Sequence, residues 1–343
     1  MEYKEILTKL CSVSAPTGFE APACAVAIEL LRPYVDEVYQ NPLGSVIGVK
    51  KCGKEGAKKL VLDAHLDEIG LIVIGHEDGF LRFSNLGGVD PRMLPDRELV
   101  IMTNPPRIGV VACTPPHVQK PGEQDKSMPI SQLYVDVGLT QEEAEKEIPI
   151  GTPMTFVGTC QSMGEHLLWG KAMDDRACFA ALLGALEQLQ TTELNCDLYI
   201  LGSVDEERGS SGAITAMWEL APDACIAVDV THGDTPDGKK LNMFPLGKGP
   251  TIGKGPNCTK WMSEKLLSIG EKEEIPVQVE VMAGHSGTNG WPMQISREGV
   301  PTAVLSLPLR YMHTPLETLH IKDLENTAKL LALFVGEYGG ATS

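Results

Sequence analysis

Five short segments of the chain place acidic residues or histidine directly after an apolar run or at the start of a helix-like run. They are residues 60–68, 172–176, 203–207, 227–230 and 311–313, and they carry His65, Asp67, Asp174, Glu206, Glu207, Asp229 and His313. Ligands in open α/β sheets collect outside the carboxyl ends of strands. Histidine and carboxylate together are the donors that borderline and hard divalent metals require. The set therefore predicts a metal site assembled from distant parts of the chain.

Each segment on its own has an ordinary explanation. A pair of adjacent acids can cap a helix or form a solvated loop. A single histidine can have a purely structural role, and a single aspartate can end a strand in a turn. For any single segment the ordinary explanation is preferred, because perturbed polar residues are often structural. What favours a metal site is the combination of all five segments.

The runs between these segments predict the elements that position them. Alternating and apolar runs predict early strands at 34–40, 45–50 and 59–64. The stretch 17–20 has the form of a capping box, which predicts that a helix starts there and ends near Pro33. After residue 164, strands alternate with helices at 177–189, 212–220 and 321–336. This alternation is typical of a mostly parallel or mixed sheet covered by helices on both faces.

The stretch from about Gly70 to about Cys160 has a different texture. Prolines, glycines and short β-like runs dominate, and the one helix-like pattern is a short acidic turn at 141–147. The predicted fold class is α/β, a mixed sheet sandwiched by helices, with an inserted small β-barrel-like domain. The predicted boundaries are 1–69 and 161–343 for the two pieces of the α/β domain and 70–160 for the insert.

Composition narrows the classes of function. The formal net charge of −17 disfavours nucleic acid and anionic membranes as partners. No apolar stretch is long enough to cross a bilayer, and the first residues lack the apolar run of a signal peptide. Nine cysteines without a CxxC pair argue against a disulfide framework or a zinc ribbon. We therefore expect a cytoplasmic protein.

The motifs as a set resemble a known family. They are SAPTGFE at 14–20, AHLDEIG at 64–70, KAMDDR at 171–176, DEERG at 205–209, AVDVT at 227–231, GKGP at 247–250, REGVPT at 297–302 and YMHTPLE at 311–317. In this order, and over nearly the whole chain, the sequence resembles the cocatalytic metallopeptidases. That family includes the tetrahedral (dodecameric) aminopeptidases and the bacterial glutamyl aminopeptidases.

The resemblance implies two divalent metal ions per subunit, zinc or cobalt. His65 and Asp229 would bind one ion, Glu207 and His313 the other, and Asp174 would bridge the two. Three protein ligands per ion leave room for water, as expected of a catalytic site. Related enzymes have a cis peptide bond after the residue that corresponds to Asp174.

The resemblance also implies the catalytic roles. Asp67 would fix the tautomer of the His65 imidazole. Glu206 would be the general base that takes a proton from a metal-bridged water and returns it to the leaving amine. One position departs from the family: Asn289 stands where related sequences usually have Asp, which puts the side-chain preference in doubt.

The implied function is that of a metalloprotease, a hydrolase that removes N-terminal residues from peptides. The implied partners are peptide substrates and copies of the chain, with the insert as dimerisation domain and dimers assembling into a hollow dodecamer. Neither nucleic acid nor membrane is expected as a partner.

Three alternatives stand beside this interpretation. Amidohydrolases, deacylases and dipeptidases of related fold share most of the ligand pattern. A non-enzymatic metal-binding or assembly protein would have no need of Glu206 beside the ligand Glu207. A glycosidase, which uses two carboxylates, leaves His65 and His313 unexplained.

Overall fold

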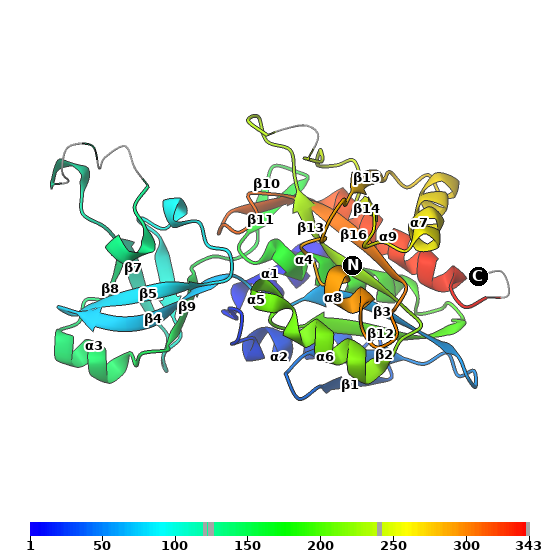
Figure 1. The fold of residues 1–343 in the computed structure, drawn as a ribbon, viewed down its shortest axis with the longest axis horizontal. Coiled ribbons are helices and arrows are strands. Elements are labelled where there is room, and N and C mark those ends of the chain that lie inside the picture. Colours follow the sequence, from blue (N-terminus) through cyan, green and yellow to red (C-terminus); the bar gives the residue numbers. More distant parts are fainter. Residues whose placement is uncertain (119–121, 123–126, 239–241, 341–343) are drawn as a thin grey trace.

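The computed structural model describes residues 1–118, 122, 127–238 and 242–340. Figure 1 shows two parts, a larger α/β part and a small β-barrel to one side of it. The α/β part is built on an 11-stranded mixed sheet. Its strands are β1 (Glu37–Gln40), β2 (Val46–Lys50), β3 (Lys58–His65), β10 (Gln161–Met163), β11 (Leu167–Gly170), β12 (Cys196–Ser203), β13 (Ala224–His232), β14 (Thr251–Lys254), β15 (Gln278–Val281), β16 (Thr302–Arg310) and β17 (Glu317–His320).

The order of the strands brings distant segments together. The main path is β1-β2-β12-β3-β13-β16-β17-β11-β10, and β14 joins β15 to β16. The four central strands β12, β3, β13 and β16 run parallel to one another. Their carboxyl ends therefore meet at one edge of the sheet, although they lie far apart in the sequence.

Helices cover both faces of this sheet. They are α1 (Tyr3–Ser12), α2 (Ala21–Leu31), α4 (Met173–Gln188), α5 (Glu206–Gly209), α6 (Ser211–Leu220), α7 (Lys260–Lys272), α8 (Gly290–Gln294) and α9 (Ile321–Glu337). On β3, Leu60 and Leu62 belong to the apolar core that includes α1, α4 and α9, whereas Val61 belongs to the core under α6 and α8. Alternate side chains of a strand point to opposite faces, so each strand serves both cores.

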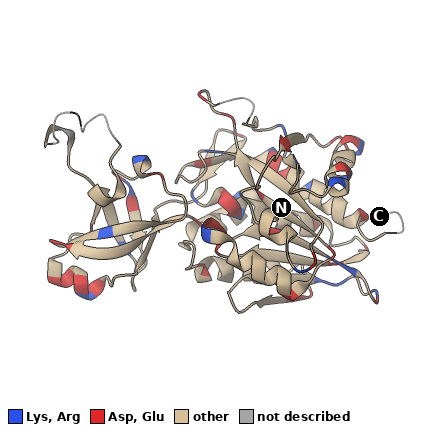
Figure 2. Cartoon of the chain, viewed as in Figure 1, with Lys and Arg blue, Asp and Glu red and all other residues tan. Residues whose placement is uncertain are grey.

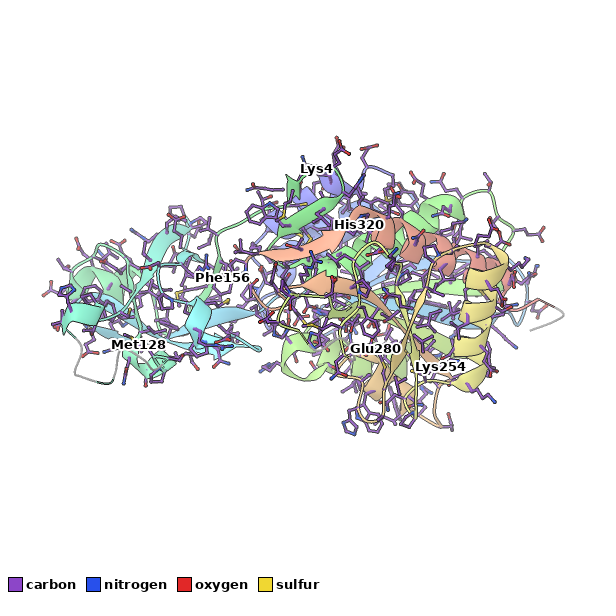
Figure 3. All side chains as sticks on the ribbon, turned by 90° about the horizontal axis from the view of Figure 1, so that it is seen from above. Lys4, Met128, Phe156, Lys254, Glu280 and His320 are labelled. Carbon is purple, nitrogen blue, oxygen red and sulfur yellow. The ribbon has the colours of Figure 1, made fainter. Side chains whose placement is uncertain are left out.

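The barrel is closed and has its own core. Its strands follow the order β4-β5-β8-β7-β6-β9 around the ring. Their bounds are β4 (Gly70–Glu77), β5 (Phe80–Leu86), β6 (Glu98–Ile101), β7 (Arg107–Ala112), β8 (Tyr134–Asp136) and β9 (Pro153–Phe156), with the helix α3 (Gln141–Glu147) and the 3₁₀ turns Pro91–Met93, Pro116–Val118 and Ile130–Gln132. Figure 3 shows Phe156 where the barrel approaches the α/β part. Residues 119–121 and 123–126 of the predicted insert lie outside the described residues.

The predicted fold class is confirmed, both in the mixed sheet between helices and in the small barrel. The predicted capping box at Thr17 and Glu20 is wrong. The Thr17 hydroxyl donates to Asp205, and Glu20 accepts from the backbone amides of Gly18 and Asp205. These side chains tie the N-terminal segment to Asp205, the residue before α5, because Thr17 and Glu20 are buried and buried polar groups need hydrogen-bond partners.

Two further expectations concern the whole chain. No helix in the described residues is long and apolar enough to cross a membrane. All nine cysteines lie in described parts of the chain, and all are free.

Candidate metal centre

The residues singled out in the sequence converge at the carboxyl edge of the central strands. His65 ends β3, Asp229 lies in the last part of β13, and Glu206 and Glu207 open α5 directly after β12. Asp174 lies at the start of α4, and His313 lies in the turn between β16 and β17. A single edge of one sheet thus holds all five segments.

The Asp174 carboxylate lies between the two histidines. Its Oδ1 is 3.1 Å from Nε2 of His65, and its Oδ2 is 3.4 Å from Nε2 of His313. Glu207 Oε1 is 3.3 Å from the same nitrogen of His313. Asp229 offers an oxygen within 4.8 Å of the ligand atoms of His65 and Asp175. The Asp174 carboxylate therefore has donor atoms on both sides: His65 near Oδ1, and His313 near Oδ2. The peptide bond between Asp174 and Asp175 is cis.

Two buried carboxylates hold these side chains in place. Asp67 accepts from the backbone amides of Glu206 and Glu207 at 3.2 and 3.1 Å, and its own carbonyl and carboxylate oxygens lie 3.2 and 3.4 Å from Nδ1 of His65. Because these oxygens can only accept, Nδ1 carries a proton, and Nε2 is the nitrogen that remains to bind an ion.

Glu317 is the second of these carboxylates. It accepts from the backbone amides of His313 and Asp174 at 2.9 and 3.1 Å. Sequence reasoning assigned it no role, although it ends the quoted motif at 311–317.

The site carries an excess of buried carboxylates. Burial raises the pKa of Glu206 to about 8, and the neighbouring Glu207 and Asp174 raise it in the same direction. Burial also raises the pKa of Asp229 well above its usual range. Burial opposes the charged form of His313, yet Asp174 and Glu207 raise the pKa of this imidazole to about 11. Such a cluster strongly favours bound positive charge.

The donor set fits divalent metal ions. Two overlapping groups, which share His65, bring their ligand atoms within 4.8 Å of one another: His65 with Asp174 and Glu207, and His65 with Asp175 and Asp229. Asp175 Oδ1 is buried and has no hydrogen-bond partner among the described residues. Nitrogen and carboxylate oxygen donors suit zinc, cobalt and similar ions. Sequence reasoning gave Asp175 no place at the site, although it follows Asp174 directly.

Two further details of the site concern the backbone at Glu206 and Glu207 and the surroundings of Asn289. Glu206 and Glu207 belong to the helical turn α5 rather than to an extended segment, so successive side chains diverge by the helical step and not by strand alternation. Asn289 is buried, and its amide donates to Asp63 and Ser203 at 2.8 and 2.9 Å. A carboxylate is therefore present beside the position where related sequences usually have Asp, but it comes from β3.

A buried ionic cluster lies next to the site in the chain, at Glu68, Lys171 and Arg176. Glu68 accepts from Lys171 Nζ at 2.8 Å, from Arg176 Nη2 at 3.2 Å and from the backbone amide of Ala15. Arg176 also donates to the carbonyls of Leu10 and Leu66. The cluster joins α1, the segment after β3 and the start of α4.

Replacing Glu68 by Gln is expected to lower the free energy of unfolding by about 3–5 kcal/mol, because two buried cations lose their counter-charge. The matched control is Glu77→Gln, which removes an exposed partner of Arg82 and is expected to cost at most about 1 kcal/mol. Denaturant unfolding of the two variants measures the difference. Equal costs would show that the buried cluster contributes no more than a surface pair.

Comparisons with known proteins show the family and the fold of the chain. The family described as M42 glutamyl aminopeptidase matches residues 44–330. The chain is 36% identical to the lysyl aminopeptidase of Pyrococcus furiosus over 340 residues, 97% of this chain and 96% of that protein. Aminopeptidase APDkam598 of Desulfurococcus kamchatkensis has a similar structure, with a TM-score of 0.90, 35% identity and coverage of 98% of this chain and 95% of the other. The TET1 peptidase of Pyrococcus horikoshii, which can assemble into a tetrahedron or a large octahedral shell, is 28% identical with a TM-score of 0.86 and coverage of 98% and 100%.

Proposed function

The chain belongs to the M42 glutamyl aminopeptidase family and is an aminopeptidase, and from this premise we propose that it hydrolyses peptides with two divalent metal ions per subunit. The observation that carries the proposal is the position of Asp174, whose two carboxylate oxygens face the Nε2 atoms of two different histidines. A carboxylate so placed can bridge two ions.

In this proposal each ion has its own pair of ligands besides the shared Asp174. His65 and Asp229 hold the first ion, and Glu207 and His313 hold the second. The neighbouring positions of His65 and Asp229 and the 3.3 Å approach of Glu207 to His313 support this division. Zinc and cobalt are the ions that we expect from these donors.

Glu206 is the proposed general base. When bound, the two ions supply Lewis-acid chemistry, since they lower the pKa of coordinated water and polarise the scissile carbonyl. Glu206 Oε2 lies 4.0 Å from Nε2 of His65, so it borders the site without a close contact to that ligand. It takes the proton of the attacking water and delivers it to the leaving amine. Asp67 keeps Glu206 and Glu207 in register by binding both of their backbone amides.

The excess of carboxylates also favours a substrate with a free, charged amino terminus. We expect rapid cleavage of a short peptide and at least about a hundredfold lower kcat/KM for the same peptide with an acetylated N-terminus, because one buried charge contact contributes about 3 kcal/mol or more. Product analysis by mass spectrometry on the two peptides measures this ratio. Preference for N-acyl amino acids would instead assign the chain to the deacylases of related fold.

The barrel is the proposed dimer contact, and dimers would assemble into a dodecamer. The assembly of the TET1 relative supports this. So does the outer face of β7, where the large apolar side chains Ile108 and Val110 are exposed. Figure 2 shows Asp and Glu on both the barrel and the α/β part. A cytoplasmic location agrees with the nine free cysteines.

Light scattering at micromolar concentration is expected to give the mass of a large homo-oligomer. The double variant Ile108→Glu and Val110→Glu is expected to reduce that mass, because charges would be buried in the contact. The matched control carries Ile214→Glu and Trp218→Glu, two exposed apolar residues of α6 in the α/β part. A monomeric mass for the unchanged chain would contradict the assembly, and equal masses for both double variants would remove β7 from the contact.

A further inference from the structure

We propose that the barrel is itself part of the metal site, and that the backbone of Gly88 positions His313 as a ligand of the second ion. This inference rests on the proposed function. It gives the insert a role at the metal site in addition to its proposed role in assembly.

The contact is made by the ring of His313. Its Nδ1 lies 2.9 Å from the carbonyl oxygen of Gly88, in the turn that follows β5. A carbonyl oxygen can only accept, so Nδ1 donates, and Nε2 is the nitrogen that remains to bind an ion. That nitrogen is the atom that faces Asp174 and Glu207. The barrel therefore fixes both the tautomer and the orientation of this imidazole.

The same turn also touches the other ligand of the second ion. A Cβ atom at Gly87 would lie 3.2 Å from Cβ and Oε2 of Glu207. The Gly87 carbonyl accepts from the Asn85 side chain at 2.8 Å and from the Val89 amide at 3.2 Å, which holds the turn in shape. Both side chains that belong to the second ion alone thus pack against the insert.

Among the described residues, the hydrogen bonds of the two ligands that belong to the first ion alone stay within the α/β part. His65 and Asp229 come from β3 and β13, and the His65 Nδ1 partner is Asp67 of the α/β part. The two sites therefore differ in origin: the sheet builds the first, and the sheet and the barrel together build the second. A change at Gly88 is therefore expected to lower the affinity for the second ion and to leave the affinity for the first ion unchanged.

The turn leaves no room for a side chain at Gly88. An added Cβ would lie 2.7 Å from Nδ1 and 2.9 Å from Cε1 of His313, closer than nonbonded heavy atoms approach. Gly87 has a positive φ of 76°, so a substitution there would strain the backbone as well, whereas Gly88 is not among the positive-φ glycines. Gly88→Ala is therefore the cleaner probe, since it displaces the imidazole.

The experiment compares metal binding by the full-length chain, its Gly88→Ala variant and the control Gly75→Ala. Gly75 lies in β4 of the same barrel, and the nearest atom to an added Cβ there is 3.9 Å away. Each protein is freed of metal and titrated with cobalt against a competing chelator, and the cobalt absorption spectrum is recorded. Gly88→Ala is expected to weaken the second equivalent by about 10–100-fold, as losses of ligand-orienting contacts do. The affinity of Gly88→Ala for the first equivalent should equal that of the unchanged chain. Gly75→Ala should bind both equivalents as the unchanged chain does.

A double-mutant cycle with His313→Ala shows whether the effect passes through the imidazole. In that background, Gly88→Ala is expected to change the second affinity less than twofold, because the ring that it displaces is absent. Full additivity of the two losses would overturn the proposal, as would unchanged affinities in Gly88→Ala. The unchanged chain is titrated first. If it binds fewer than two equivalents of cobalt per subunit, the proposed two-ion function is wrong, whatever the variants show.

Discussion

Glu206→Gln is expected to keep its bound metal and to lose about 10²–10⁴-fold in kcat, the range typical of a missing general base. The substitution removes the proton acceptor but no proposed ligand. The neighbouring amide contacts to Asp67 involve the backbone of residue 206 and are retained. Metal analysis and steady-state kinetics on the purified variant measure both quantities.

Glu207→Gln is expected to behave differently, although it changes the same chemical group one residue away. Its carboxylate lies 3.3 Å from Nε2 of His313. A neutral amide at this position would therefore lower the affinity for the second ion. Metal content should fall, and added metal should restore part of the activity. Glu193→Gln, at an exposed position, is the control for loss of one carboxylate. If Glu206→Gln loses metal and Glu207→Gln retains it, the two roles are reversed.

Much of the fold follows from local pattern. The strands predicted at 45–50 and 59–64 correspond to β2 (Val46–Lys50) and β3 (Lys58–His65), whereas β1 begins three residues later than predicted, at Glu37. The closing helix, predicted at 321–336, spans Ile321–Glu337. These elements depend on periodicity, which a single sequence displays directly.

Long-range contacts account for what the sequence could not provide. Thr17 and Glu20 match a local cap, yet both bind Asp205 about 185 residues away. The role of Glu317 depends on the fold bringing the amide of Asp174 next to that of His313. The contact of Gly88 with His313 joins two domains. No spacing in the chain encodes such contacts, because they arise only when the strand order is fixed.

Chelation is expected to abolish activity, which is the largest effect that the two-ion proposal predicts. Without the ions, nothing at the site lowers the pKa of the attacking water or polarises the carbonyl. The crowded carboxylates would then bind protons, since burial raises the pKa of Glu206 and of Asp229. Zinc or cobalt added afterwards should restore the activity.

The most direct test is a titration of metal-free enzyme with cobalt, followed by aminopeptidase activity at each step. The bridging position of Asp174 predicts that activity is absent at the start and reaches its maximum at two equivalents per subunit. Glu206→Gln should bind the same two equivalents and stay inactive throughout. Full activity in protein that elemental analysis finds free of metal, or a maximum at one equivalent with no second ion bound, would contradict the account.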